Sequence, residues 1–189
     1  MPFLYHKERI NLREVKKILL LSDTHSCAEP DIIKHFEEAD ELWHAGDWGL
    51  NELSDIMEGT GKPVRGVWGN IDGLDIRNRY PLHNQFECEG VNVWMTHIGG
   101  YPGKYNPKLI KTLKADPPML FICGHSHILR VMRDKQLNDM LYMNPGAAGR
   151  HGFHHMRTML KFVVSNGQVS DVAVIELGKR TAGILPDLQ

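Results

Sequence analysis

Short runs of apolar residues recur along the first two thirds of the chain, and a small or polar residue closes each run. The first run, Ile18 to Leu21, is not interrupted by polar residues, which is typical of a strand buried on both faces. Similar runs end near residues 45, 68, 95 and 123. Roughly 25 residues separate successive runs, enough for a strand and the connection that returns to the next one. The pattern predicts an α/β fold with several buried strands.

Helical spacing occurs between the first three runs. Apolar residues at 32, 33 and 36 predict a helix over residues 31–38, with Pro30 at a position that the first helical turn tolerates. A second helix is predicted over residues 51–58, before Gly59 and Gly61. The resulting order of strand, helix, strand, helix and strand favours a parallel start to the sheet.

The second half of the chain is predicted to be rich in strands. A hairpin around Glu89-Gly90 makes the sheet mixed, with strands expected over 85–89 and 91–96. A third helix is expected over 108–114, and further antiparallel strands over 128–134, 140–144, 157–165 and 168–177. We interpret residues 1–15 as an N-terminal extension, 16–178 as one domain and 179–189 as a C-terminal tail.

Polar residues that can bind metal follow five of the predicted strands. Because ligands in open α/β sheets bind at the carboxyl ends of the strands, these side chains are expected to converge there. Glycines directly before three of them fit sharp turns or close backbone approach. Mixed carboxylate, amide and imidazole donors suit manganese, iron or zinc better than magnesium or calcium. Seven such residues suit two ions with a bridging carboxylate: Asp23, His25, Asp47, Asn70, His97, His125 and His127.

The same residues carry a family resemblance. Their motifs resemble those of the calcineurin-like metallophosphoesterases, and most closely the small bacterial and archaeal phosphodiesterase branch, which is also similar to the scaffold subunit of retromer. The resemblance implies a four-layer α/β/β/α sandwich with two mixed β-sheets and a di-metal site at the carboxyl ends of the strands. The motifs are Asp23-Thr24-His25, Gly46-Asp47, Gly69-Asn70, Gly124-His125-Ser126-His127 and Asn144-Pro145-Gly146.

The resemblance also implies a division of the ligands. Asp47 would bridge the two metals, and Asp47, Asn70 and His97 would be the catalytic residues. One metal would be held by Asp23, His25, Asp47 and His127, and the other by Asp47, Asn70, His97 and His125. Manganese is the expected ion, with iron, zinc or nickel as alternatives.

Two positions depart from the family pattern. The phosphatase branch has a histidine directly after the motif Asn70, where this chain has Ile71, so the acid that protonates the leaving group in that branch is missing. The usual His-Gly after the fourth strand is replaced by His97-Ile98-Gly99-Gly100.

Other polar residues lie near the motifs in sequence. His44 is interpreted as a hydrogen-bonded core histidine rather than a ligand. A role behind the ligands or in substrate contact is expected for Asp72, Asn144, Arg150, His154 and His155, although a turn or a solvated loop explains the same residues.

Composition narrows the class of protein. Of 189 residues, 42% are hydrophobic and 24% charged, and a net charge of −1 gives no basic footprint for stable nucleic-acid binding. No apolar run reaches the length of about 18 residues needed to span a bilayer. Charged residues near the start leave no signal-peptide core, and three scattered cysteines fit a reducing compartment. We therefore expect a cytoplasmic protein without membrane partners, while homo-oligomerisation stays open.

These observations predict a metal-dependent phosphoesterase, in particular a phosphodiesterase, that cleaves a small phosphorylated substrate by attack of a hydroxide bridging two metals. The alternative is a non-catalytic scaffold of the same fold that resembles the retromer subunit, and the filled ligand positions argue against it. A metallo-β-lactamase fold is disfavoured because His127 is followed by Ile128-Leu129-Arg130 rather than by a further Asp-His pair.

Overall fold

The first apolar run forms the central strand of a five-stranded sheet in the computed structural model, which describes residues 15–181. The strand order is β12-β11-β1-β2-β3. Strands β2 and β3 run parallel to β1, whereas β11 pairs antiparallel with β1 and β12 antiparallel with β11. The strands are β1 (Lys16–Leu21), β2 (Glu41–His44), β3 (Val64–Gly66), β11 (Met156–Ser165) and β12 (Gln168–Lys179).

A second five-stranded sheet has the order β4-β5-β8-β10-β9 and is also mixed. Strand β8 is parallel to both of its neighbours, and the two outer pairs are antiparallel. Its strands are β4 (His83–Cys88), β5 (Val91–Thr96), β8 (Leu120–Ile122), β9 (Arg130–Asp134) and β10 (Met140–Asn144). A small hairpin, β6 (Gly100–Tyr101) and β7 (Lys104–Tyr105), precedes the last helix.

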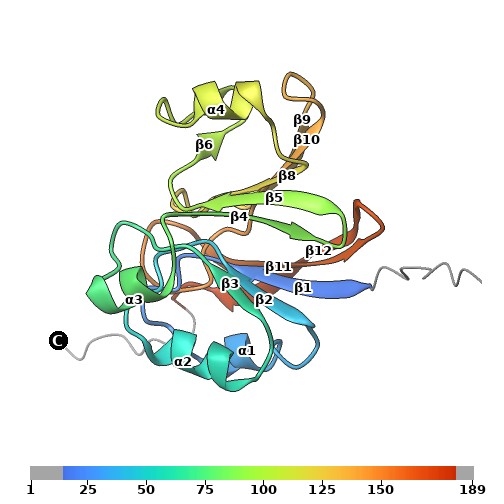
Figure 1. Cartoon of the computed structure of the whole chain (residues 1–189). Coiled ribbons are helices and arrows are strands. Elements are labelled where there is room, and N and C mark those ends of the chain that lie inside the picture. Colours follow the sequence, from blue (N-terminus) through green and yellow to red (C-terminus); the bar gives the residue numbers. More distant parts are fainter. Residues whose placement is uncertain (1–14, 182–189) are drawn as a thin grey trace, which may run out of the picture.

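The helices cover the outer faces of the two sheets. Figure 1 shows α1 (Pro30–Ile33) and α2 (Glu52–Gly59) beneath the first sheet and α4 (Ile110–Ala115) above the second, with the sheets stacked between them. Helix α3 (Leu74–Arg79) lies at the edge where β1, β2 and β3 end. The layers therefore follow the predicted α/β/β/α order.

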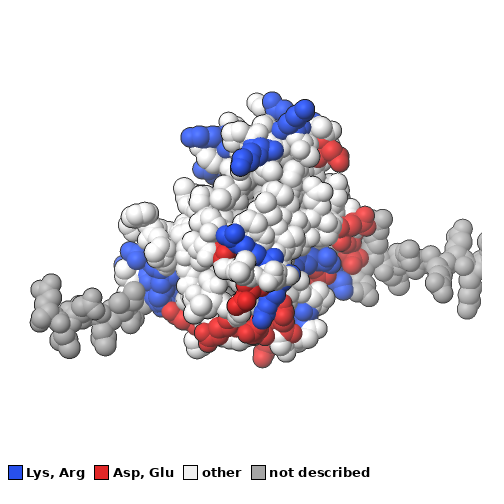
Figure 2. All heavy atoms as spheres, turned by 60° about the vertical axis from the view of Figure 1, so that its left-hand side comes forward, with Lys and Arg blue, Asp and Glu red and all other residues white. Residues whose placement is uncertain are grey.

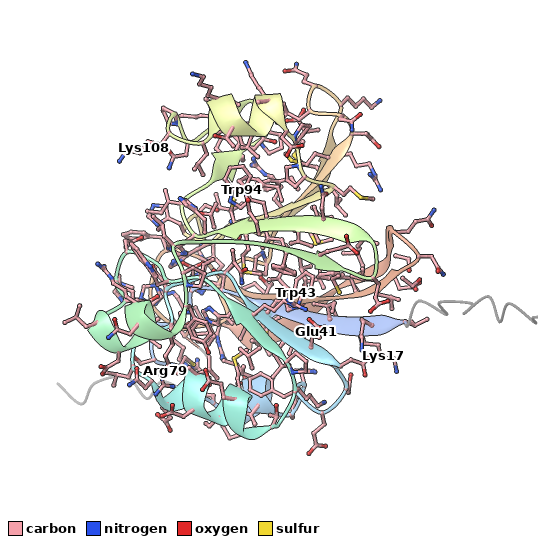
Figure 3. All side chains as sticks on the ribbon, in the orientation of Figure 1. Lys17, Glu41, Trp43, Arg79, Trp94 and Lys108 are labelled. Atoms are coloured by element: carbon pink, nitrogen blue, oxygen red, sulfur yellow. The ribbon has the colours of Figure 1, made fainter. Side chains whose placement is uncertain are left out.

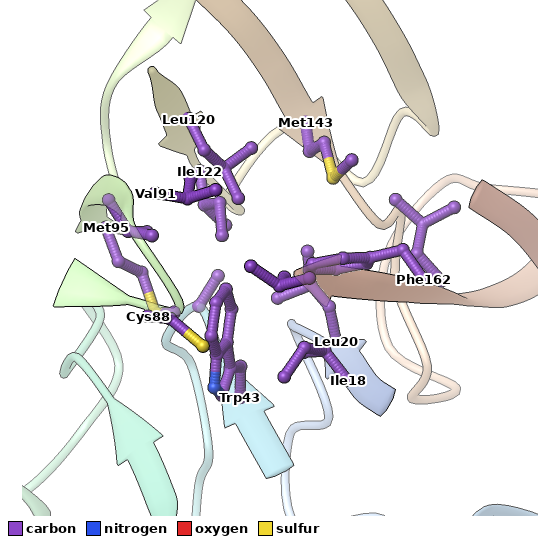
Figure 4. Close-up of a cluster of buried hydrophobic side chains, with 14 of the residues drawn as sticks. Ile18, Leu20, Trp43, Cys88, Val91, Met95, Leu120, Ile122, Met143 and Phe162 are labelled. Atoms are coloured by element: carbon purple, nitrogen blue, oxygen red, sulfur yellow. The ribbon is translucent and has the colours of Figure 1, made fainter. Parts of the chain in front are cut away.

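Three separate hydrophobic clusters hold the layers together. In β1, Ile18 and Leu20 face the second sheet, whereas Leu19 and Leu21 face the helices, so both faces of this strand are buried. The cluster between the sheets is drawn in Figure 4, where Trp43 lies among aliphatic side chains from both sheets. On the other side of the second sheet, Trp94 packs toward α4 (Figure 3). Uninterrupted apolar runs are thus explained by strands that are covered twice.

The predicted elements are confirmed with changes at their ends. Helix α1 is shorter than predicted and ends at Ile33, and β9 begins at Arg130 rather than at Ile128. Helix α3 was not predicted, because only Ile76 of its six residues is buried and no apolar periodicity marks it. The expected N-terminal extension, apart from Val15, and residues 182–189 of the expected tail lie outside the described residues.

Charged side chains are unevenly spread over the surface. Figure 2 shows mainly basic side chains over the upper layer, whereas acidic and basic side chains are mixed over the lower part. Within residues 15–181, no helix is long and apolar enough to cross a membrane. Exposed lysines of the upper layer are Lys104, Lys108, Lys111 and Lys114.

Leu20→Ala tests the core between the sheets. Leu20 is fully buried in that cluster, so we expect its truncation to lower the free energy of unfolding by about 2–5 kcal/mol. The same change at Leu74, whose side chain is 77% exposed, should stay within about 0.5 kcal/mol of wild type. Urea unfolding of both variants measures the difference, and equal losses would contradict this placement of the core.

Candidate metal centre

Five strands from two sheets end at the same edge of the molecule and deliver the seven predicted residues there. Asp23 and His25 follow β1, Asp47 follows β2, and Asn70 follows β3 in the first sheet. His97 follows β5 and the pair His125 and His127 follows β8 in the second sheet. Since each sheet contributes ligands from its parallel strands, the sandwich places the candidate site at the seam between the sheets.

The backbone at the strand ends is left-handed at five of these seven residues. The φ angles are 54° at Asp23, 47° at His25, 56° at Asp47, 67° at His125 and 56° at His127. Such angles are uncommon outside glycine and are enriched at functional sites, where the surrounding structure must enforce them. The surrounding structure therefore holds these loops in a strained backbone conformation that sets the direction of the side chains.

Two groups of three potential ligands form at this edge. Within each group the nitrogen and oxygen atoms lie within 4.8 Å of one another. Asp47 lies between the groups, with Oδ2 3.6 Å from Nε2 of His25 and Oδ1 3.2 Å from Nε2 of His97. Each group contains three of the four members of one predicted set: Asp23, His25 and His127 in one group, and Asp47, His97 and His125 in the other.

Hydrogen bonds hold both carboxylates in place. Asp23 accepts from the hydroxyl of Ser22 at 2.7 Å and from the backbone N–H of His125 at 3.0 Å, which ties β1 of one sheet to β8 of the other. Asp47 accepts from the backbone N–H of Ile71 at 3.1 Å. Ile71, which lacks the imidazole of the phosphatase branch, thus still contributes through its backbone.

The tautomer of His97 shows what the site requires. Its Nδ1 lies 2.8 Å from the carbonyl oxygen of Ala45, which can only accept, so Nδ1 carries the hydrogen and donates. In the neutral ring, Nε2 then presents a lone pair toward Asp47 and has no hydrogen-bond partner. Nε2 of His25 is likewise buried without one. Acceptors that face one another away from water need a cation near them, and mixed nitrogen and oxygen donors fit a divalent transition metal.

The pKa shifts reflect the same concentration of negative charge. Burial works to lower the pKa of His97, but the carboxylates of Asp47 and Asp23 outweigh burial and raise it. For Asp47, burial works to raise the pKa, yet the imidazole of His97 and the N–H of Ile71 lower it overall. The pKa of His25 is lowered, chiefly by burial. The carboxylate of Asp47 therefore stays ionised and attracts positive charge to this point.

A cavity of about 530 Å³ opens over the two groups. Asn70 and His125, both exposed, line it together with His151 and His154, so the predicted ligands reach the solvent side of the centre. The side chain of Phe153 is fully exposed at the rim. The sequence indicates His151 only as part of the histidine-rich segment after the Asn144 turn, for which substrate contact at the rim was one interpretation, and it assigns no role to Phe153.

Two residues predicted to lie behind the ligands hold the ligand loops. Asp72 is buried and accepts from the backbone N–H groups of Gly49 at 2.9 Å and Gly69 at 2.7 Å, which joins the loops after β2 and β3. Asn144 is also buried and donates to the carbonyl oxygen of Gly124 at 2.8 Å, next to His125. Both side chains fix backbone rather than face the cavity.

His44 is a core histidine, as predicted. Its Nδ1 accepts from the backbone N–H of Gly46 at 3.1 Å, Nε2 lies 3.0 Å from the hydroxyl of Thr24, and the ring stacks on Trp48 with centroids 3.7 Å apart. Complete burial holds its pKa well below the usual range. Thr24 lies between Asp23 and His25, so its contact with His44 holds the first motif in place.

The structure does not bring Arg150 and His155 to the cavity. Arg150 forms an ion pair with Glu29, at 2.5 Å, and donates to the carbonyl oxygen of Arg180. The ring of His155 is exposed and does not line the cavity. His154, in contrast, lies against His127, with 3.3 Å between their Nδ1 atoms.

Gly69→Ala tests how tightly the loops enclose Asp47. A Cβ at position 69 would lie 2.1 Å from Oδ1 of Asp47, so either the carboxylate or the loop must move. We expect a loss of about 1–3 kcal/mol in the free energy of unfolding and weaker binding of added Mn²⁺. Gly73→Ala is the control, because no atom lies within 4 Å of its Cβ position. Calorimetric Mn²⁺ titration and urea unfolding of both variants would show the contrast, and identical behaviour would refute the enclosure.

Solved structures support the fold. A conserved protein of Streptococcus pneumoniae, described as a predicted phosphoesterase, is 20% identical, with a TM-score of 0.64 over 87% of this chain and 91% of its own. An archaeal phosphodiesterase is 21% identical, with a TM-score of 0.63 over 84% and 99% of the two chains. Vps29 of Entamoeba histolytica, solved with zinc, is 15% identical, with a TM-score of 0.61 over 86% and 99%. At these identities the likeness concerns the fold.

The family is shown by the sequence itself. A comparison with curated proteins gave no match. The sequence profile of the calcineurin-like phosphoesterase superfamily domain, however, matches residues 17–167, which include every candidate ligand. This span also contains both sheets apart from β12 and the first residue of β1. The chain therefore belongs to the calcineurin-like phosphoesterase superfamily.

Proposed function

We propose that this protein is a metal-dependent phosphodiesterase with two divalent cations, manganese foremost, at the seam between the sheets. The observation that carries the proposal is the position of Asp47, whose two carboxylate oxygens face the unpartnered Nε2 atoms of His25 and His97. A single carboxylate placed between two ligand groups is the arrangement that a bridging ligand requires.

The residues have distinct tasks in this proposal. Asp23, His25 and His127 would hold one cation with Asp47, and Asp47, Asn70, His97 and His125 the other. Bound cations supply Lewis-acid polarisation of phosphoryl oxygens and activation of water for attack on phosphorus. Asp47 keeps the two groups in register, and Ala45 fixes the ring of His97. His125 and Asn70, at the exposed side, define where the phosphoryl group enters.

The lining of the cavity favours a diester over a monoester. Among the described residues, no Lys or Arg lines it, so only the cations and the imidazoles neutralise the substrate. A diester carries one negative charge and needs less neutralisation than the dianion of a monoester. Ile71, Ile128 and Phe153 also expose apolar surface around the opening, which suits an uncharged substituent on the phosphate.

Ile71 supports the same choice. With an isoleucine after Asn70, no imidazole at this position can protonate a strongly basic alkoxide leaving group. Esters whose leaving groups are stable as anions do not need that proton. Aryl and other activated esters should therefore react faster than alkyl monoesters.

The competing function is a binding scaffold without turnover. The likeness to Vps29 proteins raises it, and the Entamoeba histolytica Vps29 solved with zinc indicates that bound metal alone does not distinguish the two. Turnover does. A catalytic site needs, besides its ligands, a solvent-accessible opening over the metals, and here the cavity of about 530 Å³ provides one.

Asp47→Asn tests the bridge. The change keeps shape but removes the charge that faces both groups, so we expect turnover to fall at least about 100-fold and both metal equivalents to bind more weakly. Asp116→Asn, an exposed aspartate after α4, is the matched control and should retain wild-type behaviour. Metal-stripped proteins refilled with Mn²⁺ are assayed on an aryl phosphodiester, with metal content by mass spectrometry. Unchanged metal content in Asp47→Asn would exclude it as the bridge.

Substrate class is tested with matched esters. For Mn²⁺-loaded wild type, we expect kcat/KM for bis-aryl phosphate to exceed that for an alkyl phosphomonoester by at least about tenfold, because neither extra cationic side chains nor an acid at position 71 serve the monoester. Ile71→His restores the imidazole of the phosphatase branch and should narrow the ratio. A preference of wild type for the alkyl monoester would contradict the proposed class.

A further inference from the structure

A chain of hydrogen bonds runs from the backbone to His127 through a second histidine. Nε2 of His154 lies 3.0 Å from the carbonyl oxygen of Gly149, and Nδ1 of His154 lies 3.3 Å from Nδ1 of His127. The two rings meet edge to face, with centroids 5.2 Å apart. His127 therefore has a side-chain partner behind it, where His97 has a backbone carbonyl.

The direction of this chain follows from its first member. A carbonyl oxygen can only accept, so Nε2 of His154 carries the hydrogen, and Nδ1 of the neutral ring is an acceptor. The Nδ1 of His127 must then donate, which leaves Nε2 of His127 with its lone pair. That lone pair lies 3.2 Å from Oδ1 of Asp23, its partner in the candidate ligand group.

The chain of hydrogen bonds also reaches a second ligand of the same group, Asp23, through Gly149. The backbone N–H of Gly149 donates to the carbonyl oxygen of Asp23 at 3.1 Å, and the carbonyl of the same glycine accepts from His154. Gly149 thus fixes Asp23 directly and His127 through the His154 ring. The segment after the Asn144 turn therefore sets the relative position of two ligands that are about 100 residues apart in the chain.

Gly152 shows how closely this segment wraps His127. Its backbone has a φ of +119°, and a Cβ there would lie 2.3 Å from Nδ1 of His127. Only glycine leaves the ring of His127 in place while the chain passes over it to His154. Gly149, Gly152 and His154 therefore act together to hold His127 in place.

We propose that His154 is a positioning residue that fixes His127 in the Nδ1–H tautomer, so that Nε2 is presented as a ligand to one of the two cations. The inference deepens the proposed function and rests on it. It replaces substrate contact as the task of His154, since one ring nitrogen of His154 bonds the backbone and the other bonds His127. Orientation of a ligating imidazole by a group behind it is a common way to tune metal affinity.

The first test concerns metal-free wild type and needs no activity. Long-range ¹H–¹⁵N correlation spectra distinguish the two tautomers of each histidine at a pH at which the rings are neutral. We expect His127 to carry its hydrogen on Nδ1 and His154 on Nε2. If His127 carries its hydrogen on Nε2, the inference is wrong, whatever the enzyme hydrolyses.

The second test measures metal affinity in variants by competition with a chelator, using Mn²⁺ as the probe. His154→Ala removes the acceptor, and we expect one of the two equivalents to bind about 10- to 100-fold more weakly while the other changes much less. His154→Asn places an oxygen where Nδ1 was and should recover most of the affinity. His155→Ala is the control, because that neighbouring ring is exposed and outside the cavity.

The outcomes separate this inference from the proposed function. If both equivalents of His154→Ala bind as in wild type, His154 does not position a ligand, and the inference fails while the phosphodiesterase proposal stands. If wild type binds two equivalents but hydrolyses no ester, the proposed function fails, and the tautomer and affinity tests still decide the role of His154. Loss of affinity in His154→Ala without recovery in His154→Asn would also count against the inference.

Discussion

The structure depends on a set of buried acceptor atoms at the seam between the sheets, which repel one another unless a positive charge lies near them. Two buried carboxylates and at least two imidazole lone pairs point at the seam between the sheets, and burial removes the water that would otherwise solvate them. In the absence of a cation, protonation of an imidazole relieves this, and the pKa of His97 is raised because the carboxylates of Asp47 and Asp23 outweigh the lowering by burial. Divalent cations relieve it better because their charge is larger and they accept several donors at once. The local cost of left-handed backbone at five candidate ligands is consistent with a site selected for chemistry over stability.

The packing of the two sheets against each other keeps the candidate ligands close together. Ligands come from both sheets, so a shift of one sheet against the other would separate them. The cluster between the sheets resists that shift, and the bond from the N–H of His125 to Asp23 joins the two strand ends directly. Behind these, Asp72 and Asn144 hold loops with buried hydrogen bonds. The candidate ligands are therefore held by buried hydrogen bonds on the inner side and open toward the cavity on the other.

The strands, and the convergence of the candidate ligands at the strand ends, were predictable because each rests on a local pattern. An uninterrupted apolar run such as Ile18 to Leu21 requires burial on both faces, and a polar residue at its end can only lie at the sheet's edge. The segment after Asn144 was not predictable in the same way. Arg150 and His154 are both polar residues of one loop, yet Arg150 turns to Glu29 and His154 to His127. That choice depends on partners over 20 residues away in sequence, which periodicity does not encode. Helix α3 escaped prediction because it buries a single side chain.

The fold alone does not decide between an enzyme and a scaffold, because both share this architecture among the similar structures. What the structure shows is how much of it is devoted to the candidate ligands. A protein that never binds a cation gains nothing from fixing tautomers at the seam. Here Ala45 fixes the ring of His97, and a carbonyl and a second imidazole stand behind His127. Each of these arrangements leaves a lone pair that would cost free energy in a protein that never binds a cation. The hydrogen bonds behind the imidazoles, more than the imidazoles themselves, therefore favour a site that holds cations, and turnover is what separates an enzyme from a scaffold.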